Sequence, residues 1–245
     1  MKALPSRGLI AFLIACAVSG PALGQDNPVS GNVELTKEGE SKPVADQANA
    51  VVWLTPISDP ARAHATQEPA AKHYVLHQRH KTFTPHLLVI PVGASVEFPN
   101  HDPVFHNVFS LFEGKRFDLG LYEAGSSRTI RFDRAGVSYV FCNIHPEMGA
   151  VIIALRTPYH AISDHSGRIL LPQVPPGRYL LQVWHEGAAP EALKNLQREI
   201  TISDDAHSLG TMRLKLLSTQ TLAHKNKYGQ DYTRPAPEGG LYEQR

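Results

Sequence analysis

One stretch of this 245-residue chain indicates both its fold and its chemistry: Phe141-Cys142-Asn143-Ile144-His145-Pro146-Glu147-Met148. It contains a thiol, an imidazole and a thioether, with two residues between each and the next, and apolar strand patterns flank it on both sides. On a tight loop between two strands, this spacing directs the three side chains towards one centre. A further histidine lies upstream in Val104-Phe105-His106-Asn107-Val108, so we expect a site assembled from two loops.

The candidate donors are His106, Cys142, His145 and Met148. Two imidazoles, one thiolate and one weak thioether form the ligand set of a mononuclear blue-copper site. Zinc does not select a thioether, and covalent haem attachment needs a Cys-x-x-Cys-His motif that this sequence lacks. None of the 13 histidines forms the His-x-His pair that a multicopper oxidase needs, and the loop has no second cysteine for a binuclear copper centre. The sequence therefore predicts one copper ion, with His101 as a competing ligand candidate.

Four motifs between residues 72 and 157 resemble those of the cupredoxins, the family that includes plastocyanin, pseudoazurin and amicyanin. The motifs are Phe98-Pro99-Asn100, His106-Asn107-Val108, Gly136-x-x-Tyr139-x-Phe141-Cys142 and Cys142-x-x-His145-Pro146-x-Met148. The short gap between His145 and Met148, with a proline directly after the histidine, is most similar to amicyanin. The resemblance implies a Greek-key β-sandwich over this segment.

The resemblance also implies the roles of the site residues. His106, Cys142 and His145 would be the equatorial copper ligands, and Met148 would be the axial ligand. Asn107 would tie the two ligand loops together by hydrogen bonds. Electrons would leave through a partly exposed His145, which a small apolar docking patch surrounds. The predicted patch consists of Pro103, Phe105, Pro146 and Gly149.

The predicted function is the transfer of single electrons between redox partner proteins, so we expect no enzyme activity. Partners of dehydrogenase or cytochrome type would dock weakly and transiently. Two alternatives remain open: a copper-binding or copper-delivery protein whose metal leaves the site, and a non-metal adhesion or polysaccharide-binding module. The three methionines are few for a Met-rich delivery site, and an aromatic content of 8% is low for sugar-binding platforms.

The first 24 residues have the pattern of a secretory signal peptide. Two basic residues precede the apolar run Gly8–Val18, and Ala22-Leu23-Gly24 supplies a small-x-small cleavage site. The run is too short to span a membrane, so we expect a periplasmic or secreted protein without a membrane span. Leu13-Ile14-Ala15-Cys16 also resembles a lipoprotein box, which leaves open a lipid anchor at Cys16.

Cys142 would be the only cysteine left after removal of residues 1–24. It then has no partner for an internal disulfide. A thiol in an oxidising compartment is open to oxidation unless something occupies it, and a bound metal holds it as a thiolate. The formal net charge of +1 indicates no polybasic surface, so we expect no nucleic-acid partner.

The residues on both sides of the 72–157 segment predict a second, smaller β-sandwich. Short strand patterns lie at Gly31–Leu35, Ala50–Leu54, Arg168–Pro172, Tyr179–Trp184, Glu199–Ile202 and Thr211–Leu216. Segments 29–60 and 158–217 resemble the two halves of a carboxypeptidase regulatory-like (transthyretin-like) β-sandwich. We therefore predict an all-β chain with the cupredoxin-like segment inserted between these halves. The alternative is sequential units, with 29–60 packed on the cupredoxin-like segment; residues 218–245 are predicted to form an extended polar tail.

The remaining histidines have a simpler interpretation. Four of them, on or beside predicted strands, are interpreted as solvated strand residues, with a secondary metal site as the alternative. These four are His73, His77, His80 and His86. His165 lies in a predicted turn, and His185 follows a predicted strand and is expected to be structural.

Overall fold

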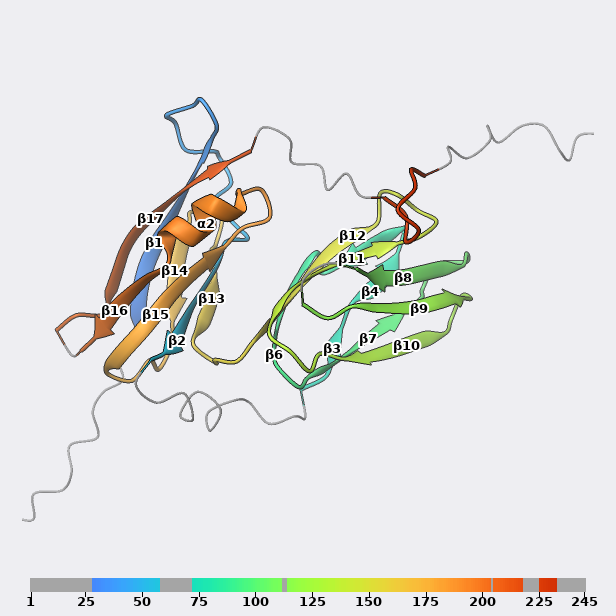
Figure 1. The fold of residues 1–245 in the computed structure, drawn as a ribbon, viewed down its shortest axis with the longest axis horizontal. Coiled ribbons are helices and arrows are strands. Elements are labelled where there is room, and N and C mark those ends of the chain that lie inside the picture. The colour runs from blue at the N-terminus through green and yellow to red at the C-terminus, as the bar shows by residue number, and fades with distance from the viewer. Residues whose placement is uncertain (1–27, 58–71, 112–113, 204, 218–224, 233–245) are drawn as a thin grey trace, which may run out of the picture.

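The computed structural model describes residues 28–57, 72–111, 114–203, 205–217 and 225–232. These residues form two β-sandwiches that lie side by side (Figure 1), which confirms the predicted all-β class. We call residues 72–157 the inserted sandwich, and residues 28–57 together with 158–217 the split sandwich. The predicted signal peptide, including Cys16, lies outside the described residues.

The split sandwich is built from both ends of the chain. Its elements are β1 (Val29–Lys37), β2 (Val51–Pro56), β13 (His160–Ile162), β14 (Arg168–Leu171), β15 (Gly177–Trp184), α2 (Pro190–Leu196), β16 (Arg198–Ile202) and β17 (Ser208–Leu216). They form one sheet of order β14-β1-β17 and one of order β13-β2-β15-β16. Strand β1 runs parallel to β17, and β2 runs antiparallel to β15. The N-terminal strands therefore complete sheets made by the C-terminal strands. The similarity of this unit to a carboxypeptidase regulatory domain stays a prediction.

The inserted sandwich holds the middle of the chain. Its strands are β3 (Tyr74–Val75), β4 (His77–Arg79), β5 (Thr82–Thr84), β6 (Leu87–Pro91), β7 (Ser95–Pro99), β8 (His106–Ser110), β9 (Phe117–Tyr122), β10 (Ser127–Arg131), β11 (Gly136–Cys142) and β12 (Gly149–Leu155). A sheet of order β6-β12-β11-β8-β9 faces one of order β10-β7-β3, and β4 and β5 form a hairpin. Strand β5 ends at Thr84, directly before Pro85, which has no N–H to donate to a sheet, and β6 begins at Leu87.

Strand β12 is buried on both of its faces. Alternate residues have opposite faces in a strand, so Ala150, Ile152 and Ala154 enter the core of the inserted sandwich. The intervening Val151 and Ile153 pack instead with Val51 and Trp184 of the split sandwich. The continuous apolar run from Ala150 to Leu155 therefore reflects a strand that lies between two cores.

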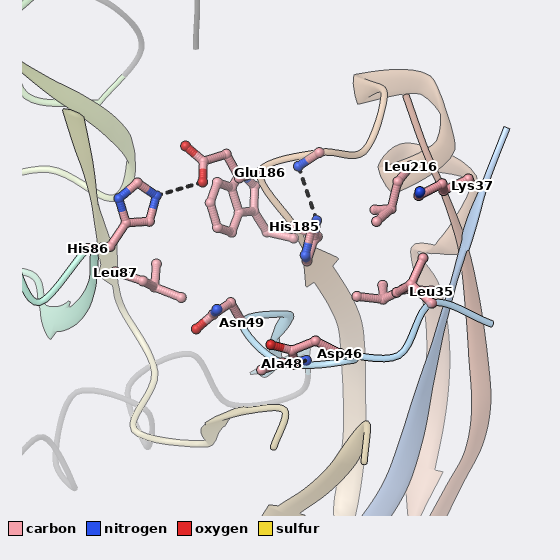
Figure 2. Close-up of a pocket in the computed structure, with 13 residues that line it drawn as sticks. Leu35, Lys37, Asp46, Ala48, Asn49, His86, Leu87, His185, Glu186 and Leu216 are labelled. Atoms are coloured by element: carbon pink, nitrogen blue, oxygen red, sulfur yellow. Dashed lines mark hydrogen bonds and ion pairs between the residues drawn. The ribbon is translucent and has the colours of Figure 1, made fainter. Parts of the chain in front are cut away.

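A cavity of about 360 Å³ opens beside this interface, lined by residues of both sandwiches (Figure 2). At its edge, His86 Nε2 lies 2.7 Å from Glu186 Oε2, and these residues belong to the inserted and the split sandwich respectively. The hydrogen bond to Glu186 raises the pKa of His86, although burial acts in the opposite direction. The pair is thus a polar link between the two sandwiches.

Candidate metal centre

The loop between β11 and β12 is held in a tight turn by its own backbone. Cys142 is the last residue of β11 and pairs with Val108 of β8. Its N–H donates to the carbonyl of Met148 at 3.2 Å, and the N–H of Met148 donates to the carbonyl of His145 at 3.1 Å. These bonds fold the loop back on itself, so that residues six positions apart meet at its base.

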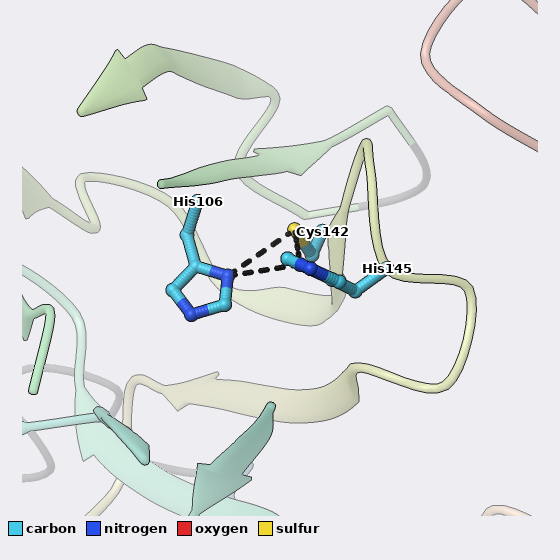
Figure 3. A group of neighbouring side chains, drawn as sticks. All are labelled: His106, Cys142 and His145. Carbon is cyan, nitrogen blue, oxygen red and sulfur yellow. Dashed lines mark hydrogen bonds between the residues drawn. The ribbon is translucent and has the colours of Figure 1, made fainter. Parts of the chain in front are cut away.

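Three of the predicted ligands come together at this loop (Figure 3). His106, the first residue of β8, places its Nδ1 atom 3.1 Å from Nδ1 of His145. The sulfur of Cys142 lies 3.7 Å from His106 Nδ1 and 3.5 Å from His145 Nδ1. The donor atoms of His106, Cys142 and His145 all lie within 4.8 Å of one another. The described residues contain no other such group of three or more His, Cys, Asp or Glu side chains.

The donor distances fit a single first-row metal ion. A metal about 2.0–2.1 Å from each imidazole nitrogen and about 2.3 Å from a thiolate would hold nitrogen and sulfur about 3.5–3.8 Å apart at bond angles of about 107° to 120°. Both sulfur–nitrogen distances fall in this range. The shorter nitrogen–nitrogen distance corresponds to a narrower angle between the imidazoles. Together with the N₂S donor set, this geometry fits copper.

The predicted axial residue, Met148, lies in the core below the loop. Its side chain is fully buried and belongs to the same apolar cluster as Cys142, Val108 and Tyr122. His106 and Cys142 are also fully buried, whereas His145 is only half-buried. His145 is thus the predicted ligand that reaches the surface, while the other three are buried.

Asp102 fixes the orientation of His106, which the sequence did not predict. Its Oδ2 atom lies 2.9 Å from His106 Nε2, and the backbone N–H of Lys81 donates to the same oxygen at 2.8 Å. Burial alone raises the pKa of Asp102, but the bonds from Lys81, His106 and His80 outweigh this effect and lower it. An ionised carboxylate only accepts, so Nε2 of His106 carries the proton and Nδ1 keeps a free lone pair for a metal.

The protonation of the other two donors follows from burial. Burial raises the pKa of the Cys142 thiol, and the backbone N–H groups of Asn107, Ile144 and His145 act against this by favouring the thiolate. Burial, followed by the electrostatic effect of the neighbouring His106, lowers the pKa of His145. A neutral imidazole at His145 is the form that binds a metal.

Asn107 joins the two ligand loops, but mainly through its backbone. Its carbonyl accepts a hydrogen bond of 3.0 Å from the N–H of Asn143, the residue after Cys142. Its side-chain Nδ2 donates instead to Oδ1 of Asp118 on β9, at 2.7 Å. Asp118 lies on a strand that was not predicted, so its contact with the site could not be foreseen.

The other histidines within the described residues do not join the donor group. His101 is exposed, and its Nε2 lies 3.0 Å from Nδ1 of His77. His73 contacts Glu97 at 2.7 Å, and an exposed His165 contacts Asp46 at 3.0 Å. The competing ligand His101 is therefore placed away from the Cys142 sulfur, at the surface.

No protein-family model matches this chain, and no curated protein matches it. Among solved structures, a Cu-containing nitrite reductase (NirK) from Thermus scotoductus SA-01 is 24% identical over 38% of this chain, with a TM-score of 0.33. The match spans only 26% of that protein. A purple cupredoxin from Nitrosopumilus maritimus is 24% identical, with 34% of this chain and 99% of that chain covered and a TM-score of 0.31.

A Cu(I) form of an amicyanin variant is also similar to part of this chain. It is 16% identical, with 42% of this chain and 98% of that chain covered and a TM-score of 0.32. Likenesses at this level of similarity support no conclusion about function.

Proposed function

We propose that this protein is an exported type 1 copper protein that carries single electrons between redox partner proteins. The observation that supports this most strongly is the group of His106, Cys142 and His145, whose donor atoms lie within 4.8 Å of one another, while Met148 is buried in the same apolar cluster as Cys142. Copper bound there would supply a one-electron Cu(II)/Cu(I) couple. No substrate pocket is needed for this function.

The protein's contribution is to hold the donors still. His106 is fixed by Asp102 from one side, and Cys142 is fixed by backbone bonds to Met148 and by pairing with β8. Donors that do not move between the two oxidation states keep the reorganisation energy low, which favours fast electron transfer. The burial of the sulfur also limits access of oxidants to the thiolate.

The half-buried His145 is the proposed exit for electrons. Exposed apolar side chains directly precede both histidine ligands in the chain: Phe105, before His106, is 51% exposed and Ile144, before His145, is 45% exposed. Pro103 and Pro146 of the predicted patch are also exposed, while Gly149 is half-buried. An apolar surface of this kind suits brief docking of a dehydrogenase or cytochrome, because transient redox interfaces are small.

The proposed location outside the cytoplasm rests on the sequence of residues 1–24. Within the described parts of the chain, no helix is long and apolar enough to cross a membrane. We propose a periplasmic or secreted protein, with a lipid anchor at Cys16 as the alternative form of export.

The experiment that tests this function is copper loading of the mature protein. We expect one Cu(II) per chain, an intense visible thiolate-to-copper band and a reversible one-electron potential. The variant Cys142→Ala should lose the band, and His101→Ala, which removes an exposed imidazole close to His106 in sequence, should keep it. Colourless, readily exchanged copper would instead indicate delivery, and absence of stoichiometric binding would exclude both copper functions.

A further inference from the structure

Residues 225–232, near the C-terminus, lie against the loop that holds the proposed copper ligands (Figure 1). We call these residues the C-terminal segment. They follow the last strand of the split sandwich in the chain but contact the inserted sandwich. Nothing in their sequence pattern predicts this contact, because the segment is polar and contains no strand or helix signal.

Two hydrogen bonds join the segment to consecutive residues of the ligand loop. The hydroxyl of Tyr232 donates to the backbone carbonyl of Cys142 at 2.7 Å. The backbone N–H of Lys227 donates to Oδ1 of Asn143 at 2.9 Å. The segment thus holds the residue that supplies the thiolate and the residue that follows it.

Lys227 is also linked, through Asp118 on β9, to the residue after His106. Its Nζ atom lies 2.7 Å from Oδ2 of Asp118, the carboxylate whose other oxygen accepts from the Asn107 side chain. Burial alone raises the pKa of Asp118, but the bonds from Lys227 and Asn107 outweigh it and keep this carboxyl ionised. One lysine therefore connects the residue after Cys142 with the residue after His106.

The segment is folded in a way that presents Lys227 to the loop. The side chain of Asn226 accepts hydrogen bonds from the backbone N–H groups of Tyr228 and Gln230, each at 3.0 Å. The N–H of Asn226 also donates to the carbonyl of Gln230 at 2.9 Å. Such a turn reduces the conformational freedom that docking would otherwise cost.

We propose that the C-terminal segment is a tethered clamp that positions the Cys142–Met148 loop, with Tyr232 and Lys227 as positioning residues. The role of this clamp in retaining a metal rests on the proposed function, whereas its contacts with the loop do not. Because the clamp is part of the same chain, its effective concentration at the loop is high, and the docked state is favoured even by few hydrogen bonds. Its effect is to slow opening of the loop and loss of the metal.

The test compares Tyr232→Phe and Lys227→Met with the unaltered full-length protein. Hydrogen exchange of the Cys142, Asn143 and Met148 amides is measured in the metal-free protein, and transfer of Cu(I) to a chelator is measured in the loaded protein. Loss of one hydrogen bond or ion pair should accelerate both processes by about three- to tenfold.

Two matched controls remove comparable interactions elsewhere. Tyr179→Phe deletes a hydroxyl that donates to the Pro175 carbonyl at 2.7 Å in the split sandwich. Lys115→Met deletes an ion pair with Asp133 at 3.0 Å in the inserted sandwich. Neither control should change exchange at the loop amides or the rate of copper transfer.

Unchanged loop exchange in both clamp variants, with thermal stability equal to the controls, would overturn the clamp. Faster loop exchange in the clamp variants alone supports it. Exchange is read without metal, so failure of the protein to bind copper leaves this result standing and contradicts only the proposed function. If the protein binds copper but the clamp variants leave both the loop exchange and the copper transfer unaltered, the clamp is contradicted and the proposed function stands.

Discussion

At the scale of single residues, the site depends on buried polar groups as much as on the donors themselves. Asp102 is buried and accepts from His106 and from two backbone N–H groups, so it sets both the tautomer and the ring orientation of one ligand. Removal of such a partner leaves a ligand free to rotate and a buried N–H without an acceptor.

We predict that Asp102→Ala weakens copper binding by about 10- to 100-fold, the usual cost of losing the hydrogen-bond partner of a ligating histidine. Asp102→Asn keeps an acceptor oxygen and should recover part of the affinity. Competition with a copper chelator measures the effect. An affinity unchanged in Asp102→Ala would mean that His106 does not depend on this contact.

The axial role of Met148 gives a second prediction. Met148→Leu keeps the buried volume, at a cost below about 1.5 kcal/mol, but removes the thioether. Because a weak axial sulfur stabilises Cu(II) more than Cu(I), its loss should raise the reduction potential. Met212→Leu makes the same change in the core of the split sandwich and should leave the potential unaltered in voltammetry. Equal potentials in both variants would contradict axial coordination.

The spacing of the loop made three candidate ligands visible from the sequence, because Cys142, His145 and Met148 are close together in the chain. His106 was predicted from the family resemblance and its following Asn107. Asp102 and Asp118 could not be predicted, since their contacts depend on how separate loops fold. The contact of Tyr232 with Cys142 joins residues 90 positions apart and has no local signal.

At the scale of elements, the packing of a strand against one core was easier to predict than packing against two cores. The apolar run of β12 was predicted as a strand, but its packing against both cores was not visible, because continuous burial hides the alternation of faces. The strand β9 was not predicted; it contains Gly120, whose φ of 69° is positive.

The His86–Glu186 link between the two sandwiches should make stability depend on pH. The pKa of His86 is raised by Glu186, so the pair stabilises the fold fully below the unfolded-state value of 6.5 and is lost as pH rises through the higher folded-state pKa. The free energy of unfolding of the metal-free protein is measured in urea at pH values from 6.5 to above the folded-state pKa of His86. Over this range the unaltered chain should lose more stability than Glu186→Gln does.

The control for this prediction is Asp46→Asn, which alters an exposed His–carboxylate contact that does not join the two sandwiches. It should follow the pH dependence of the unaltered protein. A pH profile of Glu186→Gln that matches the unaltered protein would show that the pair contributes nothing measurable.

At the scale of the whole molecule, the chain order suggests that the two sandwiches unfold together. The split sandwich closes only when β1 and β2 meet strands that follow the inserted sandwich. Apolar packing of Val151 and Ile153 against Val51 and Trp184 then joins the two cores. Both tryptophans, Trp53 and Trp184, lie in the split sandwich, whereas a copper band would report on the inserted sandwich.

We predict that tryptophan fluorescence and the copper band follow one transition in denaturant. Ile153→Ala should remove packing worth about 2–5 kcal/mol at the interface and separate the two transitions. Leu54→Ala, in the core of the split sandwich, should destabilise by a similar amount without being placed at the interface. Coincident transitions in Ile153→Ala would contradict coupling through this surface.

The most direct test of the central claim is X-ray absorption at the copper edge of the loaded, full-length protein. A centre made of His106, Cys142 and His145 predicts one sulfur and two imidazole nitrogens at about 2.0–2.3 Å. The short sulfur distance should disappear in Cys142→Ala. Copper bound only by nitrogen and oxygen in the unaltered protein, with no sulfur neighbour, would contradict the account.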